Sequence, residues 1–343
     1  MFDVNSDDIQ RVLGEYGVTA RVRGAEELVR YRYDEESGQV RLILKCTLDG
    51  GDALIVKFKN EDGVTRELIE AQSRFSEHLA ENGVPTAAFL RAGDAIAIQR
   101  ELNGYRVCVT AERFRDGEIK IIDGDIAEKT GALLAHTHII AQRDDLHVDC
   151  PVIFDVFADW NDLFSFSLFE ELRGKFEGED AARFERILSK YRRRMAALDS
   201  LRGRRRYAVQ GDISQCNLFM TADGEIGMFD FNRCGDNVLF CDAIMQAVFE
   251  ARLMDCDREL TDEYSRELLR RFLRGYHSVR PFTAGERALI PQLTAVINAF
   301  WLSDIYYGEN SLTKLAERGD TAAAGGMLRR MERIISEDVE LDF

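Results

Sequence analysis

The sequence predicts an α+β protein with a small antiparallel sheet near its N-terminus and a larger, mainly helical part after it. Three observations indicate this fold class. Stretches of alternating or β-branched residues dominate residues 1–112. From about Asp125 onward, apolar residues recur at the three- and four-residue spacing of helices. A hairpin pattern interrupts those helices at residues 218–229. We therefore expect two domains, at residues 1–112 and 113–343.

The N-terminal part is expected to form strands that polar or glycine-containing turns separate. One helix pattern stands among them at residues 66–81, because Leu68, Ala71, Phe75 and Leu79 make an apolar stripe. That helix should end near Gly83, before Pro85. The expected strands are 27–33, 39–47, 53–59, 95–99 and 105–111.

The C-terminal part carries apolar residues at helical spacing in six segments. At 343 residues the chain is long enough for two hydrophobic cores. The expected helices are 160–176, 180–202, 242–254, 262–277, 284–307 and 311–337.

The hairpin pattern carries the residues of greatest chemical interest. Asp223-Gly224 is a dipeptide that two-residue type I′ turns prefer, and apolar runs flank it. Counting outward from that turn places Asn217 opposite Asp230, with Cβ atoms roughly 4.5–5.5 Å apart. An amide oxygen and a carboxylate at that separation suit one Mg²⁺ ion, which prefers oxygen ligands. We expect a metal site at the open end of the hairpin.

A further carboxylate, Asp212, lies five residues before Asn217 on a loop that Gly211 opens. In phosphoryl transfer a carboxylate orients the attacking hydroxyl and accepts its proton. Asp212 suits that role. The alternative is that Asp212 is a loop residue, Asn217 a turn residue and Asp230 the polar end of a strand.

The pattern Asp212-x-x-x-x-Asn217 followed by Asp230 resembles the signature of the aminoglycoside phosphotransferase and choline kinase family, which is itself similar to the protein kinases. The resemblance implies a two-lobed, protein-kinase-like fold and an ATP-dependent small-molecule kinase. Asp212 would be the catalytic base, and Asn217 and Asp230 would bind Mg²⁺. Two positions depart from the family pattern: Gln210 stands where His is usual, and Asn232 replaces the second acid of D-x-D.

The resemblance also implies where the nucleotide binds. Lys57 matches the lysine that binds the α- and β-phosphates, although Lys59 lies on the same face of its strand. Glu70 is the candidate acidic partner of Lys57, with Gln72 and Glu67 as alternatives.

The segment after the last N-terminal strand resembles the family's interlobe hinge. Backbone N–H and C=O groups of Glu112, Arg113 and Phe114 would bind adenine there, and an ordinary strand-to-helix loop is the alternative. His138 and Asp242 match family positions whose role is structural.

Composition narrows the class of partner. A net charge of −16 and a pI near 4.9 disfavour nucleic acid and anionic membranes, because a polyanionic surface repels phosphates. No apolar run approaches the roughly 20 residues that span a bilayer. Seven cysteines without a C-x-x-C pair favour a reduced cytoplasm.

The leading prediction is a cytoplasmic enzyme that moves the γ-phosphate of ATP to a hydroxyl of a small molecule. The acidic charge suits a cationic acceptor such as an amino sugar or a choline-like amine. Asp155, Asp304 and Trp301 are among the residues expected near that acceptor, together with Asp159, Trp160, Asp162, Tyr307 and Glu309. The alternative is a non-catalytic nucleotide-binding or scaffold protein on the same fold, and protein kinase activity is a weaker one. The acceptor and the oligomeric state are left open by the sequence.

Overall fold

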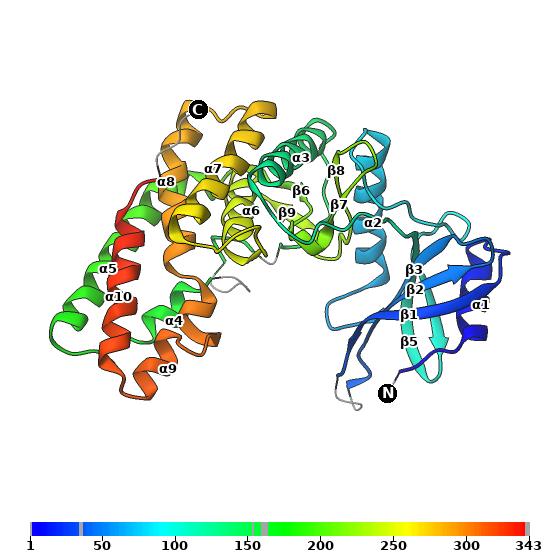
Figure 1. Ribbon diagram of the computed structural model, residues 1–343, viewed down its shortest axis with the longest axis horizontal. Helices are drawn as coiled ribbons and strands as arrows, with labels where there is room; N and C mark the ends of the chain where they lie inside the picture. The colour runs from blue at the N-terminus through cyan, green and yellow to red at the C-terminus, as the bar shows by residue number, and fades with distance from the viewer. Residues whose placement is uncertain (1, 34–36, 153, 159–163, 340–343) are drawn as a thin grey trace. The chain divides into compact units, whose positions relative to one another are not determined.

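The computed structural model describes residues 2–33, 37–152, 154–158 and 164–339, and it divides into two compact units (Figure 1). The first unit comprises residues 1–119 and 216–232, and the second comprises 120–215 and 233–343. This division differs from the expected domains, 1–112 and 113–343. Segment 113–119 stays with the sheet, and the hairpin belongs to the first unit although it follows almost a hundred residues of the second.

A five-stranded antiparallel sheet of order β1-β2-β3-β5-β4 forms the centre of the first unit. Its strands confirm the predicted α+β class, and each overlaps an expected strand. Adjacent residues point to opposite faces, so the sheet has one apolar face and one face that carries Lys57 and Lys59. The strands are β1 (Val22–Tyr31), β2 (Val40–Leu48), β3 (Ala53–Asn60), β4 (Ile98–Leu102) and β5 (Tyr105–Arg113).

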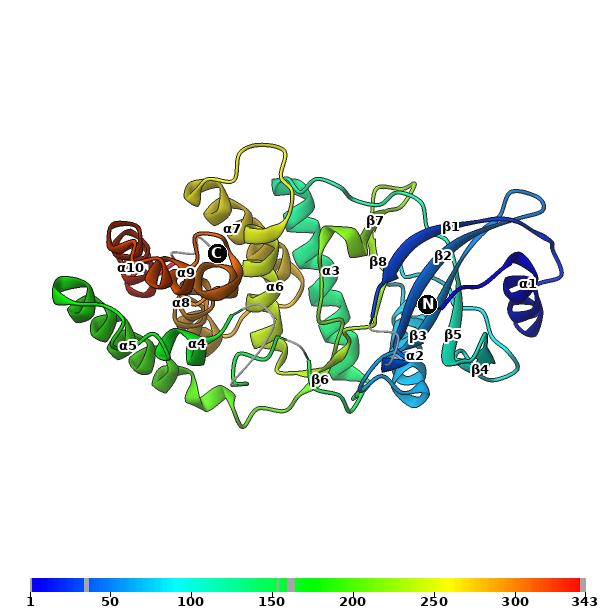
Figure 2. The same ribbon diagram turned by 90° about the horizontal axis from the view of Figure 1, so that it is seen from below.

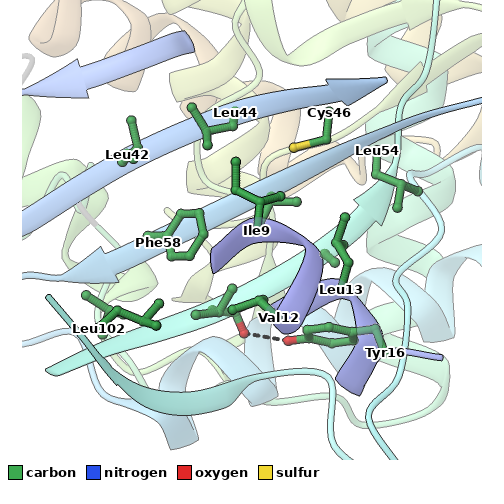
Figure 3. Packing of buried hydrophobic residues seen from close by; sticks show 14 of the residues in the cluster. Ile9, Val12, Leu13, Tyr16, Leu42, Leu44, Cys46, Leu54, Phe58 and Leu102 are labelled. Carbon is green, nitrogen blue, oxygen red and sulfur yellow. Dashed lines mark hydrogen bonds between the residues drawn. The ribbon is translucent and has the colours of Figure 1, made fainter. Parts of the chain in front are cut away.

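Helix α1 (Ser6–Glu15), which was not predicted, covers the apolar face of the sheet. Figure 3 shows its Ile9, Val12 and Leu13 directed at the apolar side chains of the strands. The Tyr16 hydroxyl donates to the carbonyl oxygen of Val109 at 2.7 Å, which satisfies the polar end of this buried ring. Asn5 begins the helix, because its side chain accepts from the N–H groups of residues 7 and 8.

Helix α2 (Arg66–Glu81) has the predicted bounds and packs on the other face of the sheet. Its Ile69 contacts Cys108 of β5, whereas the neighbouring Val107 and Val109 face α1. Figures 1 and 2 show α1 and α2 on opposite sides of the strands. The Thr65 hydroxyl caps the N-terminus of α2 by accepting from Leu68 N–H. The helix leaves part of this face, around Lys57, to other elements.

The hairpin forms, but its register differs by one residue from the prediction. Strand β7 (Leu218–Met220) pairs with β8 (Ile226–Met228) through Phe219 opposite Gly227. The loop has three residues, because Thr221 pairs with Glu225 and Gly224 takes φ +80°. A type I turn closed by a left-handed glycine is a common three-residue loop, and Asp-Gly fits it as well as a type I′ turn. Asn217 therefore stands opposite Phe229 rather than Asp230.

Backbone pairing on both sides fixes the hairpin within the first unit. Residues 117–119 pair with β7, and Met228 N–H donates to the carbonyl of Pro85 at 2.9 Å. Gly227 permits this approach, because a Cβ at that position would lie 2.7 Å from the Pro85 carbonyl oxygen. These pairings explain why the hairpin groups with the sheet.

Helices make up most of the second unit, as predicted (Figures 1 and 2). Two expected helices are interrupted: residues 284–307 contain α8 and then a π-helical turn, and residues 311–337 divide at Gly319, whose φ is +70°. Among the described residues of this unit, strand β6 (Tyr207–Val209) pairs with strand β9 (Gly235–Asn237). This pairing was not predicted. The α-helices are α3 (Gly124–Arg143), α4 (Phe166–Glu170), α5 (Gly178–Leu198), α6 (Leu239–Leu253), α7 (Asp262–Val279), α8 (Ala284–Ala299), α9 (Leu312–Glu317) and α10 (Thr321–Ser336).

Helices α3 and α7 approach closely enough that glycine is required where they meet. A Cβ at Gly275 of α7 would overlap the carbonyl oxygen of Glu128, and a Cβ at Gly131 of α3 would overlap that of Phe272. No described helix is long and apolar enough to cross a membrane.

We predict that Gly275→Ala destabilises the second unit, because the added methyl group forces α3 and α7 apart. Overpacking of this kind costs about 1–3 kcal/mol. The matched control is Gly326→Ala in α10, where the nearest atom would be the flexible end of Arg329 at 3.7 Å. Alanine favours helix over glycine, so this control should be neutral or stabilising. Urea denaturation measures both, and equal stability of the two variants would contradict the close-packing interpretation.

Candidate functional site

Lys57 is the centre of a buried charged cluster in the first unit. Its Nζ lies 3.0 Å from Glu112 Oε1 and 3.1 Å from Asp230 Oδ1. Lys57 on β3 pairs with Thr110 on β5, so Glu112, two residues further along β5, shares its face. Although burial alone would lower the pKa of Lys57, the attraction of Asp230 and Glu112 raises it above its ordinary value. The lysine is therefore a permanent cation.

Asp230 reaches this lysine because the chain turns sharply after β8. Its φ is 55°, in the left-handed region that aspartate tolerates better than most residues. Burial alone would raise its pKa, but the attraction of Lys57 and Lys59 lowers the pKa to about 2. At neutral pH this side chain is a carboxylate, as a ligand for a hard cation must be.

Asn217 lies at the same end of the hairpin as Asp230. Its carbonyl oxygen accepts from Phe229 N–H at 3.0 Å, and it is buried. The structure therefore brings both expected metal ligands into the first unit, without the direct cross-strand opposition that was predicted. Within the described residues no three His, Cys, Asp or Glu side chains are grouped to hold a metal ion. Magnesium commonly takes only one or two protein carboxylates and completes its shell with water and phosphate oxygens.

Glu70 is not the acidic partner of Lys57 in this structure. One of its carboxylate oxygens accepts from the N–H groups of Ile96 and Ala97, at 2.9 and 2.8 Å, and the other lies 2.7 Å from Arg74. Glu70 thus fixes the segment before β4, and Glu112 takes the place expected for it beside Lys57. No local sequence pattern identifies Glu112 in this role, because the contact depends on the pairing of β3 with β5.

Gln72 of α2, one of the alternatives, contacts the segment that follows Asp230. Its Nε2 donates to the carbonyl oxygen of Asn232 at 3.2 Å. Phe75, one turn further along α2, packs edge-on against Phe231. Helix α2 therefore holds the segment that follows Asp230.

The expected hinge residues use backbone groups to hold the sheet together. Arg113 N–H donates to Ala88 at 2.8 Å, and Phe114 N–H donates to Ala53 at 3.0 Å. These two N–H groups are not free for adenine in this structure. The next one, of Arg115, has no hydrogen-bond acceptor within the described part of the chain.

The second unit holds Asp212 on the loop after β6. Gln210, where the family usually has His, is fully buried, and its Oε1 accepts from Asp212 N–H at 2.7 Å. Gly211 is needed before Asp212, since its φ is +81° and a Cβ would lie 2.5 Å from the Arg233 carbonyl oxygen. The glutamine therefore supports the loop as expected from its hydrogen-bonding groups.

Side chains of helix α6 and of Met254, the residue that follows it, accept hydrogen bonds from this loop. The Gln246 Oε1 accepts from Ile213 N–H at 3.0 Å, and the Met254 sulfur accepts from Gln215 N–H at 3.1 Å. Asp242 and Gln246 are four residues apart, so they share one face of the helix, and Met254 directly follows the end of the helix. Sequence reasoning missed Gln246 and Met254, although two polar residues four apart in an apolar helix, Asp242 and Gln246, were a visible signal.

Asp242 of α6 also belongs to a buried hydrogen-bond network. Asp242 Oδ2 lies 3.1 Å from His138 Nε2, and His138 Nδ1 lies 2.8 Å from the Tyr276 hydroxyl. Complete burial lowers the pKa of His138, although Asp242 opposes that effect. His138 and Asp242 are positioned to support the loop rather than to touch a substrate.

Two acids expected to line an acceptor pocket are instead paired with arginine. Asp155 lies 2.7 Å from Arg206, and Asp304 lies 2.8 Å from Arg252. Trp301 is buried, and Glu309 pairs with Lys314. Tyr307 is exposed, and the expected Asp159, Trp160 and Asp162 lie outside the described residues.

We predict that Lys57→Met destabilises the first unit, because it leaves the buried Glu112 carboxylate without its cation. Removing one partner of a buried pair costs about 3–5 kcal/mol. Arg66→Met is the control, since Arg66 pairs with Glu67 at an exposed site and its loss should leave stability unchanged. Urea denaturation at pH 7 makes the comparison, and a Lys57→Met protein as stable as wild type contradicts the prediction.

The pH dependence of that difference supplies a second check. The pKa of Asp230 is lower in the folded protein, about 2, than in the unfolded chain. Its contribution is therefore complete above about pH 4 and is lost as the pH falls toward 2. The gap in stability between wild type and Lys57→Met should narrow over that range.

Comparisons with known proteins identify the family and the fold. The model of the phosphotransferase enzyme family (APH) matches residues 36–282. No curated protein matches the chain. Among solved structures, an amicoumacin kinase, hAmiN, in complex with AMP-PNP, Ca²⁺ and Ami, shares 15% identity with a TM-score of 0.58 and covers 98% of this chain and 96% of its own.

Two further structures have the same fold. A microcompartment-associated aminopropanol kinase has 17% identity and a TM-score of 0.62, with 97% of this chain and 98% of that chain covered. An aminoglycoside phosphotransferase from Alicyclobacillus acidocaldarius has 12% identity and a TM-score of 0.53, with 98% of both chains covered. The family match covers most of the sequence, so this chain belongs to the phosphotransferase enzyme family and is a small-molecule phosphotransferase.

Proposed function

We propose that this protein transfers the γ-phosphate of ATP to a hydroxyl group of a small molecule in the cytoplasm. The observation that carries the proposal is the buried Lys57 ammonium between Glu112 and Asp230. A lysine fixed by a carboxylate, beside an aspartate able to bind Mg²⁺, is the arrangement that nucleotide phosphates require. The family match and the kinase folds of similar structures support the same reaction class.

The residues of the first unit suit MgATP. Asp230 and Asn217 would supply a carboxylate and an amide oxygen to Mg²⁺, and Lys57 would bind the α- and β-phosphates. Magnesium, when bound, neutralises charge that develops on the transferred phosphoryl group. Adenine would bind at the backbone after β5, where Arg115 N–H is the first donor without an acceptor among the described residues.

Asp212 would act as the base. We infer that it orients the acceptor hydroxyl and takes up its proton as the oxygen attacks phosphorus. The loop that carries it is held by Gln210 and Gln246, whose side-chain oxygens accept from the backbone N–H groups of Asp212 and Ile213. Such preorganisation allows a base to act without rearrangement.

We place amino alcohols and amino sugars first among the acceptors to be tested. The net charge of −16 attracts cations at long range. The similar structures include an aminopropanol kinase and an amicoumacin kinase. Because Asp155 and Asp304 are paired with arginine, neutral alcohols and sugars belong in the same panel.

We predict that Asp212→Asn lowers phosphate transfer by about 10²–10⁴-fold, the usual contribution of a general base. Folding and MgATP binding should be unchanged, because the amide keeps the size of the side chain. The assay couples ADP release to the acceptor panel, and calorimetry measures MgATP binding. Asp223→Asn, in the exposed hairpin loop, is the control and should keep full activity. Full activity of Asp212→Asn would falsify the assigned role.

We predict that Gln246→Leu lowers kcat while leaving the KM for ATP unchanged. The substitution leaves the buried Ile213 N–H without its acceptor, which costs about 1–3 kcal/mol and loosens the loop of Asp212. Gln246→Glu keeps an acceptor oxygen and should retain more activity. A variant with lower stability but normal kcat would assign Gln246 to folding alone.

A further inference from the structure

Lys59 is a second buried lysine on the face of the sheet that carries Lys57. It follows Lys57 by two residues on β3, so the two side chains point to the same side. Arg41 of β2 and Cys108 of β5 flank it in the register. Only 8% of Lys59 is exposed, the same fraction as for Lys57.

The two lysines differ in their partners. Lys57 has Glu112 and Asp230, but no carboxylate in the described part of the chain lies within 4.0 Å of the Lys59 ammonium. The nearby Glu61 is engaged by Arg41, whose Nε lies 2.8 Å away, and by the Tyr33 hydroxyl. Glu112, Asp230 and Glu61 are therefore each paired with a group other than Lys59.

The pKa of Lys59 is lowered in this environment. Burial lowers its pKa to about 8, and Lys57 and Arg41 act in the same direction, while Asp230 and Glu61 oppose them only in part. A buried ammonium without a paired anion destabilises a fold, because nothing compensates its desolvation. A bound phosphate group beside Lys59 would supply the missing negative charge.

The order of residues along the sheet indicates which part of a nucleotide could supply that charge. β5 ends at the segment expected to bind adenine, and Lys57 and Lys59 stand opposite its Thr110 and Cys108. Lys59 is thus further from the adenine end than Lys57, by about 6.6 Å along the strand. If Lys57 binds the α- and β-phosphates, Lys59 reaches the next group along the chain of phosphates.

We propose that Lys59 binds the γ-phosphate of the nucleotide and so distinguishes ATP from ADP. This assignment rests on the proposed function, since it requires the nucleotide at Lys57. It gives the enzyme two phosphate-binding lysines on one strand with separate roles. Lys57 contributes to binding of both nucleotides, whereas Lys59 contributes only when the third phosphate is present.

The binding test compares Lys59→Met with wild type by calorimetry, using AMP-PNP and ADP in the presence of Mg²⁺. The affinity for AMP-PNP should fall at least tenfold, and the affinity for ADP should change less than twofold. Lys57→Met should weaken both nucleotides. Lys129→Met, which removes a positive charge that pairs with Asp125 in the second unit, should change neither.

A stability measurement separates ligand binding from a structural role. Without nucleotide, Lys59→Met should have a higher Tm than wild type, because an uncompensated buried charge is replaced by an apolar group of similar length. The gain should be larger at pH 7 than at pH 10. Wild-type Lys59 loses its proton near pH 8 when folded but only near its ordinary pKa of about 10.5 when unfolded, so its charge destabilises the fold below pH 8 and less so above.

Two outcomes overturn the assignment. Equal loss of affinity for AMP-PNP and ADP, together with a lower Tm, would make Lys59 a structural partner of Asp230 and Glu61. Unchanged binding of both nucleotides would show that Lys59 contacts neither. A wild-type protein that binds no nucleotide would contradict the proposed function itself, and this result differs from either failure of Lys59→Met alone.

Discussion

The pairing of Lys57 with Glu112 and Asp230 is the interaction on which the candidate nucleotide site depends. It joins three segments far apart in the sequence: β3, β5 and the turn after β8. Lys57 and Glu112 are buried and Asp230 is 23% exposed, so the buried ammonium and the buried carboxylate are tolerable only because they neutralise one another. The ion pair between Lys57 and Asp230 therefore explains why Asp230 belongs to the sheet-containing unit and why its side chain is an anion at neutral pH.

The proposed base is supported by a different kind of contact. Gln246 of helix α6 and Met254, which directly follows the helix, accept from backbone N–H groups of the loop, and Asp242 of the same helix contacts His138. The division between the two units falls between residues 215 and 216, inside the spacing that separates Asp212 from Asn217. The proposed base and metal ligands are thus close in sequence, while each is fixed by the core of its own unit.

Local sequence patterns predicted most helices and strands of the fold. The contacts of the candidate site depend on long-range strand pairing, so they could not be predicted in the same way. The apolar stripe of α2 gave its bounds because periodicity is a property of neighbouring residues. The predicted hairpin register was wrong by one residue, because the Asp-Gly dipeptide suits loops of two lengths. The Thr221 hydroxyl accepts from Glu225 N–H and so favours the longer loop. Glu112 could not be identified as the partner of Lys57, because β5 pairs with β3 across an intervening strand in the sequence.

The departures from the family pattern are compatible with the proposed chemistry. Gln210 supplies a hydrogen bond to the loop and needs no charge to do so. Asn232, where the family usually has an acid, offers its backbone oxygen to Gln72 and removes one negative charge from the segment after Asp230. Lys59 adds a positive charge to the same unit without a paired acid among the described residues. The lack of an acid at position 232 and the positive charge of Lys59 both favour the more highly charged nucleotide by Coulomb attraction, as the proposed role of Lys59 requires.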